Sequence, residues 1–357
     1  MTPLSRPGRR NLVGSRDLRG GYDPPLAPYL GDGERIKRHP HASPEWTGQE
    51  RKPLTHPPER DLEQPEYKGP IVNRAVDTNR WDLVPPRTGD IVVAVADKMG
   101  TTWSQMLCAL LVHGPDLPRP LTELSPWLDG GAWNNNEDAV EVFNAQTFRR
   151  VIKTHTPFHN LKYRPDAFYV TCGRDPRDVF LSSMDHAENS ASPGGAPPPD
   201  TPLDRNRLFA SMLNFDRPRN IAGVFDHVAS CWRYRSLPNI HFLHYNDMSD
   251  DLEGETARLA SFLGIERSPD EITALADHAR FGAMRAEADN LAPGSKVAGR
   301  WKSNADFFRK GRRGEWREVY SPETQALYVS ATRSRYDQTM LDWLESGRSA
   351  TGDPKDI

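Results

Sequence analysis

The feature that most constrains this chain is one unit within residues 90–114. Residues 91–96 form a short apolar run rich in β-branched side chains, which is typical of a buried parallel strand. Residues 97–102 interrupt the run with polar side chains and a glycine. Apolar residues then recur at the spacing of one helix face, at Trp103, Met106, Leu107, Leu110 and Leu111. The sequence therefore predicts a strand, a tight turn and a helix.

The turn has the composition of a phosphate-binding loop. Lys98 supplies a mobile positive charge, Gly100 lets the backbone approach an anion, and Thr101 and Thr102 add hydroxyl donors. The free N–H groups at the start of the helix point to the same place, at the carboxyl end of the strand. Because Lys98 precedes Gly100, the order differs from that of the nucleotide P-loop. We predict a phosphate loop of a different type; the alternative is a strand-to-helix turn without a ligand.

Composition sets the expected domain boundaries. Residues 1–64 hold ten of the 32 prolines and many arginines without apolar periodicity, so we expect a disordered tail. Residues 65–345 are expected to form one folded domain, and residues 346–357 a loose C-terminal tail.

Charge and cysteine content narrow the class of protein. The 46 lysines and arginines nearly balance 49 acidic residues, so the net charge of −3 gives no reason to expect a nucleic-acid partner. The sequence has no apolar run long enough for a membrane span and no signal-peptide core. The three cysteines lack metal-type spacing, and we expect reduced thiols in a cytoplasmic protein.

A second predicted strand places basic side chains near the phosphate loop. Residues 151–152 lead into Lys153 and His155, and Pro157 favours an extended backbone before it. Residues two apart on a strand share a face, so both side chains are expected at the edge that carries Lys98. A lone histidine is usually structural; its pairing with a lysine makes it a candidate for catalysis.

A third predicted strand, residues 167–172, is followed by Arg174. Asp175 is a suitable N-cap and Pro176 a suitable first residue for the next helix, which places Ser182 about two turns along it. An arginine at a strand end suits a second phosphate, although a salt bridge is the alternative.

The remaining periodicity completes the predicted fold. Helices are expected at residues 225–234, 251–263, 269–279 and 322–344, with a fourth strand at residues 240–245. Alternating strands and helices predict a single α/β domain, with a central parallel sheet flanked by helices.

Three loops are candidates for roles around the site. The tryptophans of residues 117–136, Trp127 and Trp133, are either core anchors or walls of a pocket. Residues 187–201 are polar and proline-rich, as in a lid. A final loop gathers glycines and four cations that we expect around a terminal phosphate: Arg309, Lys310, Arg312 and Arg313.

Four segments, in order and at similar spacing, resemble the cytosolic-type sulfotransferases that use 3′-phosphoadenosine-5′-phosphosulfate (PAPS), especially bacterial small-molecule members. The resemblance spans about residues 67–344. The usual loop of that family reads Lys-Ser-Gly-Thr-Thr-Trp. The matching segments are Lys98-Met99-Gly100-Thr101-Thr102-Trp103, Lys153-Thr154-His155, Arg174 with Ser182, and residues 309–316.

The resemblance implies roles for individual residues. PAPS would be the co-substrate, with its 5′-phosphosulfate held by Lys98, Met99, Gly100, Thr101 and Thr102, and its adenine against Trp103. Tyr245 and Phe281 would also contact the nucleotide. The 3′-phosphate would be held by Arg174, Ser182, Arg309, Lys310 and Gly311. The chain departs from the family at Met99, Ala279, Arg280 and Glu315, and residues 317–326 lack its dimer motif, so no oligomeric state is implied.

The expected chemistry is sulfuryl transfer to a hydroxyl or amine of a small-molecule or lipid acceptor. His155 is the candidate general base. The rate of turnover is then expected to fall as the pH drops through the ordinary pKa of histidine, about 6.5. Lys98 would stabilise the leaving phosphate, and Lys153 the transferring sulfuryl oxygens. No metal is expected, because no triphosphate demands one. A P-loop kinase-like phosphotransferase and an inactive nucleotide-binding interaction protein are the alternatives, and phenol, alcohol, sterol, glycolipid and amine acceptors all stay open.

Overall fold

The computed structural model describes residues 63–357 except residues 132–136, 191–201, 295–299 and 309. The predicted N-terminal tail lies almost entirely outside the described residues. So do most of the candidate lid, Trp133 and Arg309.

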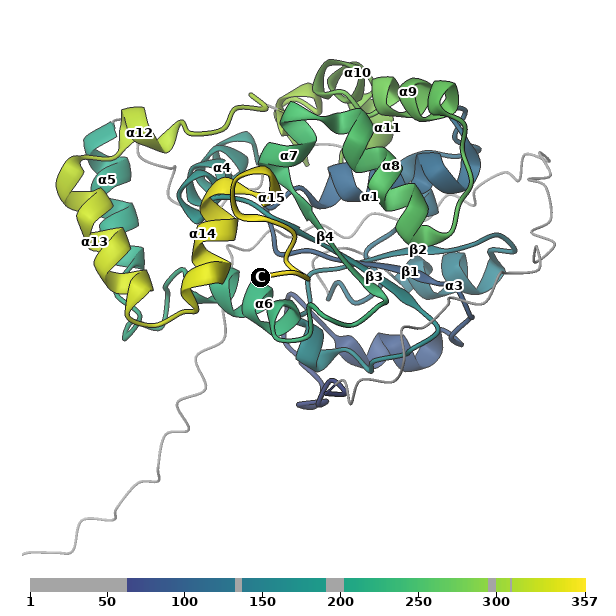
Figure 1. Ribbon diagram of the computed structural model, residues 1–357, viewed down its shortest axis with the longest axis horizontal. Helices are drawn as coiled ribbons and strands as arrows, with labels where there is room; N and C mark the ends of the chain where they lie inside the picture. The colour runs from purple at the N-terminus through teal and green to yellow at the C-terminus, as the bar shows by residue number, and fades with distance from the viewer. Residues whose placement is uncertain (1–62, 132–136, 191–201, 295–299, 309) are drawn as a thin grey trace, which may run out of the picture.

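A four-stranded parallel sheet forms the centre of the molecule, in the order β2-β1-β3-β4 (Figure 1). Every residue of the four strands is buried, because helices cover both faces, and this explains the continuous apolar runs in the sequence. The prediction of one α/β domain with a parallel sheet is confirmed. The strands are β1 (Ile91–Ala94), β2 (Val151–Thr154), β3 (Phe168–Gly173) and β4 (Ile240–His244).

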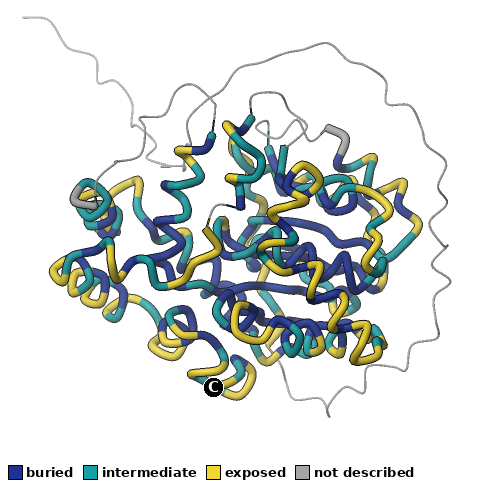
Figure 2. The backbone as a smooth tube through the Cα atoms, turned by 90° about the horizontal axis from the view of Figure 1, so that it is seen from above, coloured by how far each residue is buried: buried dark blue, intermediate teal, exposed yellow. Residues whose placement is uncertain are grey.

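Helices flank the sheet on both sides. On one face lie α1 (Thr101–His113) and α8 (Leu252–Leu263), and on the other lies α6 (Ala222–Trp232) (Figure 1). Figure 2 shows the buried strands enclosed by helices whose outer surfaces are exposed. Among the described residues, no helix combines the length and the apolar character that crossing a membrane requires.

Further helices complete the domain. They are η1 (Thr78–Leu83), α2 (Leu121–Leu124), α3 (Glu137–Ala145), η3 (Phe158–Asn160), α4 (Pro176–Asn189), α7 (Tyr245–Asp250), α9 (Pro269–His278), α10 (Phe281–Ala286), α11 (Ala288–Leu291) and η4 (Ala305–Phe308). Predicted helix starts are confirmed at Asp175, Asp251 and Ser268, whose side chains accept hydrogen bonds from backbone N–H groups of the first turn.

The predicted final helix is two helices. Helix α13 (Pro322–Arg333) ends before Asp337, whose side chain accepts from the Met340 N–H at 2.8 Å and starts α14 (Gln338–Ser346). The prediction of one continuous helix was wrong because this aspartate caps a new one. Together with α5 (Pro202–Met212) and α12 (Trp316–Val319), these helices form a group beside the sheet (Figure 1).

Residues 346–357 do not form the loose tail that the sequence predicted. They form α15 (Arg348–Thr351), and the Arg348 side chain donates to the buried carboxylate of Glu255 at 2.7 Å. Arg235 also donates to the Ile357 carbonyl at 2.8 Å. Glu255 also pairs with Arg258 at 2.7 Å, so the tail supplies a second cation to this buried carboxylate.

One buried ion pair joins the amino ends of β1 and β2. Asp90 and Arg150 precede paired strand residues, and the guanidinium binds the carboxylate at 2.9 and 2.6 Å. Their side chains are only 8% and 1% exposed.

We predict that Asp90→Asn lowers the free energy of unfolding by about 3 to 5 kcal/mol, because it leaves a buried guanidinium without its counter-charge. Urea denaturation measures the change. Asp82→Asn is the matched control, since Asp82 pairs with Lys162 in solvent, where both side chains are more than half exposed. Equal losses in the two variants would contradict the assigned role of the buried pair.

Candidate functional site

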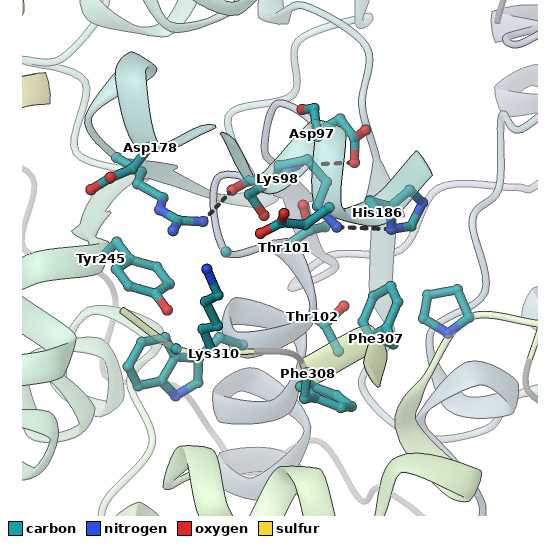
Figure 3. A pocket seen from close by; sticks show the side chains of 18 of the residues that line it. Asp97, Lys98, Thr101, Thr102, Asp178, His186, Tyr245, Phe307, Phe308 and Lys310 are labelled. Atoms are coloured by element: carbon teal, nitrogen blue, oxygen red, sulfur yellow. Dashed lines mark hydrogen bonds between the residues drawn. The ribbon is translucent and has the colours of Figure 1, made fainter. Parts of the chain in front are cut away.

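The loops after β1, β2 and β3 meet in one cavity of about 980 Å³ (Figure 3). Strand β2 lies on one side of β1 and β3 lies on the other, so the connections of the sheet leave its centre in opposite directions. Open α/β sheets bind ligands at such a point, outside the carboxyl ends of the strands. The cavity brings together most of the predicted site residues: Lys98, Gly100, Thr101, Thr102, Trp103, Lys153, His155, Arg174, Ser182, Tyr245, Phe281, Lys310 and Gly311.

The predicted phosphate loop has two residues with left-handed backbone. Lys98 has φ 63° and Gly100 has φ 100°, and this path carries the chain from β1 directly into the first turn of α1. A Cβ at Gly100 would lie 3.3 Å from the Cys172 sulfur, so glycine suits this position in both conformation and space. Met99 is fully buried in the core. Its side chain therefore does not line the cavity, contrary to the expectation from the family resemblance.

Lys98 rests against the ring of His186. The Lys98 Nζ lies 3.0 Å from His186 Nδ1 and 5.0 Å from the centre of the Phe307 ring (Figure 3). Burial and the charge of Lys98 lower the pKa of His186 to about 3, so the neutral ring accepts a hydrogen bond from the ammonium. Sequence reasoning did not place His186 beside Lys98, although it lies one helix turn beyond Ser182 on α4.

Burial also disfavours the positive charges of the two lysines. It lowers the pKa of Lys98, and it lowers that of Lys153 to about 8, with the neighbouring ammonium adding to the effect. An anion bound between them would reverse this penalty, so the cavity is suited to a negatively charged ligand.

His155 is held in one orientation. Its Nδ1 lies 2.7 Å from the Val95 carbonyl, to which it donates, and this leaves Nε2 as the acceptor nitrogen. Trp127 packs edge to face against the ring, with centroids 4.7 Å apart. Trp127 lines the cavity, so it is a pocket wall as well as a packing residue.

A buried carboxylate supports this arrangement from behind. Asp129 is fully buried, and it accepts hydrogen bonds from Trp127 at 2.6 Å and from the hydroxyls of Thr154 and Thr156 at 2.6 and 2.8 Å. Trp81 donates to it as well, at 2.8 Å. Because Thr154 and Thr156 flank His155, Asp129 fixes the backbone that carries it. Sequence patterns did not indicate this contact.

Arg174 lies on the opposite side of the phosphate loop. It donates to the carbonyls of Lys98 and Arg312 at 3.2 Å each, and its guanidinium lies 4.3 Å from the centre of the Tyr245 ring. Its Nε is buried and has no hydrogen-bond partner among the described residues, which leaves a donor for a ligand. Trp103 packs edge-on against Tyr245, with centroids 5.3 Å apart.

The glycine-rich basic loop covers this side of the cavity. A Cβ at Gly311 would lie 2.6 Å from the Phe281 ring, so only glycine allows this approach. Asp178 on α4 anchors the loop by accepting from the Gly314 N–H at 2.6 Å. The expectation that four cations surround one phosphate was wrong for Arg313, because that side chain pairs with Asp250 and does not line the cavity.

Arg280 is likewise paired at the surface, with Asp277 at 2.7 Å and Glu253 at 3.2 Å. Arg280 nevertheless lines the cavity.

Comparisons with known proteins agree with this geometry. The family profile described as "Sulfotransferase domain" matches residues 88–340. A glycolipid sulfotransferase of Mycobacterium bovis is 33% identical over 317 residues, covering 78% of this chain and 96% of that protein. Sulfotransferase 2B1 of Mus musculus is 25% identical over 261 residues, covering 70% and 72% of the two chains.

Solved structures share the fold. Retinol dehydratase in a complex with retinol and PAP has a TM-score of 0.57 and 24% identity, with 73% of this chain and 89% of that chain covered. Mouse sulfotransferase SULT7A1 complexed with PAP has a TM-score of 0.57 and 21% identity, with 74% and 90% covered.

An α/β fold with a strand–turn–helix unit and two buried lysines at the carboxyl edge of its sheet is suited to a ligand with an anionic group. The chain belongs to the sulfotransferase family, and the activity that this supports is sulfuryl transfer.

The structure corrects the expected titration of His155. Burial and the charge of Lys153 lower its pKa to about 4, well below the ordinary value of about 6.5. The unfolded chain therefore binds more protons than the folded protein between these two pH values. The contribution of His155 to stability therefore falls as the pH falls through this window.

We predict that the His155 ring in the free protein titrates by NMR with a midpoint near pH 4. The resonance is assigned by its loss in His155→Gln, and circular dichroism confirms that the protein stays folded over the range used. A midpoint near 6.5 would show that the ring is solvated and that Lys153 does not act on it.

Proposed function

We propose that this protein transfers the sulfuryl group of PAPS to a hydroxyl of a glycolipid acceptor. The observation that carries the proposal is the position of His155, whose Nε2 is left as an acceptor beside two lysines and the amino end of α1. The mycobacterial relatives are described as glycolipid sulfotransferases, which is the basis for the acceptor class.

The nucleotide would lie between the phosphate loop and the basic loop. Lys98, Thr101, Thr102 and the first N–H groups of α1 would hold its 5′ end. Trp103, Tyr245 and Phe281 would contact the adenine. The unpartnered Nε of Arg174 supports a 3′-phosphate on that side, with Ser182, Lys310 and Gly311 completing the site. Arg309 is included in this proposal on the basis of the family resemblance alone.

The residues of the cavity divide the chemistry between them. His155 Nε2 takes the proton from the acceptor hydroxyl as its oxygen forms a bond to sulfur. The bond between sulfur and the bridging phosphate oxygen breaks, and Lys98 leaves His186 to neutralise the charge on that oxygen. Lys153 neutralises the sulfuryl oxygens during transfer. His155 then releases its proton to solvent.

The two rival readings are less well supported. A kinase would need the glycine-lysine order of the nucleotide P-loop, and the chain belongs to a different family. An inactive binding protein would have no need for a histidine held in one tautomer by Val95.

We predict that adenosine 3′,5′-bisphosphate binds at least about tenfold more tightly than AMP and does not need Mg²⁺, because two separate cationic regions meet its two phosphates. Titration calorimetry with and without EDTA measures both affinities. Preference for ATP with Mg²⁺ would overturn the choice of donor.

We predict that His155→Ala lowers kcat by about 10² to 10⁴ while the affinity for adenosine 3′,5′-bisphosphate stays within about twofold. Turnover is measured as transfer of label from PAPS to a glycolipid. Lys98→Ala should instead lose both affinity and rate, because its charge meets the donor before and during the reaction. His159→Ala is the control, since that histidine does not line the cavity. Near-normal turnover of His155→Ala would make this histidine structural.

A further inference from the structure

The cavity contains a carboxylate that the proposed mechanism does not use. Asp97 ends the run that begins with β1, and its side chain is exposed within the lining of the cavity (Figure 3). One oxygen accepts a hydrogen bond from the Lys98 N–H at 3.0 Å. Among the described residues Asp97 forms no ion pair, so its other oxygen remains available to a ligand.

Asp97 lies on the side of the cavity that holds the base. Its carboxylate interacts electrostatically with Lys98, His155, His186 and Lys153. Asp97 lies two residues after Val95, whose carbonyl orients His155. Asp97 and His155 line the same cavity, so Asp97 can contact an acceptor that presents its hydroxyl to His155.

Asp97 is ionised in this position. The side chain is exposed to the cavity, but the protein atoms around it displace water and oppose its charge. The positive charge of Lys98 and the other basic groups outweighs that effect and lowers its pKa to about 2. An ionised carboxylate only accepts hydrogen bonds, so it requires a donor on the acceptor molecule. It also makes a poor general base, and it repels anionic acceptors such as phenolates.

The adjacent walls are aromatic. Trp301 packs against His186 and Phe307, with centroid distances of 4.7 and 5.6 Å, and Trp127 lies on the His155 side. Such rings suit the C–H faces of a saturated ring, while a carboxylate suits the hydroxyls on its rim. A hydrogen-bond-accepting carboxylate in a cavity that also has aromatic walls favours a polyhydroxylated ring over a single alcohol.

We propose that Asp97 determines acceptor specificity by accepting a hydrogen bond from an acceptor hydroxyl other than the one that is sulfated. The acceptor class is then a neutral carbohydrate headgroup with at least two free hydroxyls. This inference rests on the proposed function, and it adds a residue and a chemical criterion for the acceptor.

The test compares two acceptors that differ in the number of hydroxyls, octyl β-glucoside and 1-octanol, with labelled PAPS. We expect Asp97→Asn to lower kcat/KM for octyl glucoside by about tenfold to hundredfold, because a hydrogen bond to a charged group is lost. For 1-octanol the change should be less than about threefold. The ratio of the two kcat/KM values is the quantity that decides.

A matched control variant separates the possible results. Asp306→Asn removes another carboxylate of the cavity lining, one that is paired with Arg285, and should leave the ratio unchanged. Equal losses on both acceptors for Asp97→Asn would place Asp97 in the chemistry or the fold and overturn the inference, as would no loss on either. If the wild-type protein sulfates neither acceptor nor any glycolipid while binding adenosine 3′,5′-bisphosphate, the proposed acceptor class fails with it. Turnover of the alcohol alone would overturn only the inference.

Discussion

The left-handed backbone at Lys98 and Gly100 is the constraint on which the site depends. It turns the chain at the carboxyl end of β1 so that α1 begins at once, with its free N–H groups directed to the cavity. The same turn places Lys98 next to His186 and puts Asp97 on the side of His155. A conventional loop at this point would separate these groups.

Burial disfavours the charged forms of the basic groups in the cavity. Two lysines and two histidines lie close together, and burial together with repulsion from neighbouring cations lowers the pKa of each. The histidines are therefore neutral over most of the pH range, which suits one of them to accept a proton. Asp129 holds the base from behind with neutral donors alone, so it adds rigidity without an additional cation.

The parts of the site that the sequence could predict are those set by local chemistry. Lys98, His155 and Arg174 each follow a short apolar run, and the ends of parallel strands meet at one edge, so their convergence follows from order alone. The pairing of Arg313 with Asp250, the burial of Met99 and the low pKa of His155 depend on packing between segments far apart in sequence. The break between α13 and α14 was missed because Asp337 offers a cap only where the chain can turn there.

Helix α4 bears three of the residues that define the site, spaced four apart on one face. Asp178 anchors the basic loop, Ser182 lines the cavity beside it, and His186 contacts Lys98 (Figure 3). With a rise of about 1.5 Å per residue, Asp178 and His186 are separated by about 12 Å along a rigid axis. The helix thus sets the distance between the two ends of the cavity. Inserting one residue between Ser182 and His186 would turn the histidine about 100° away from Lys98, while Asp178 and Ser182 kept their positions.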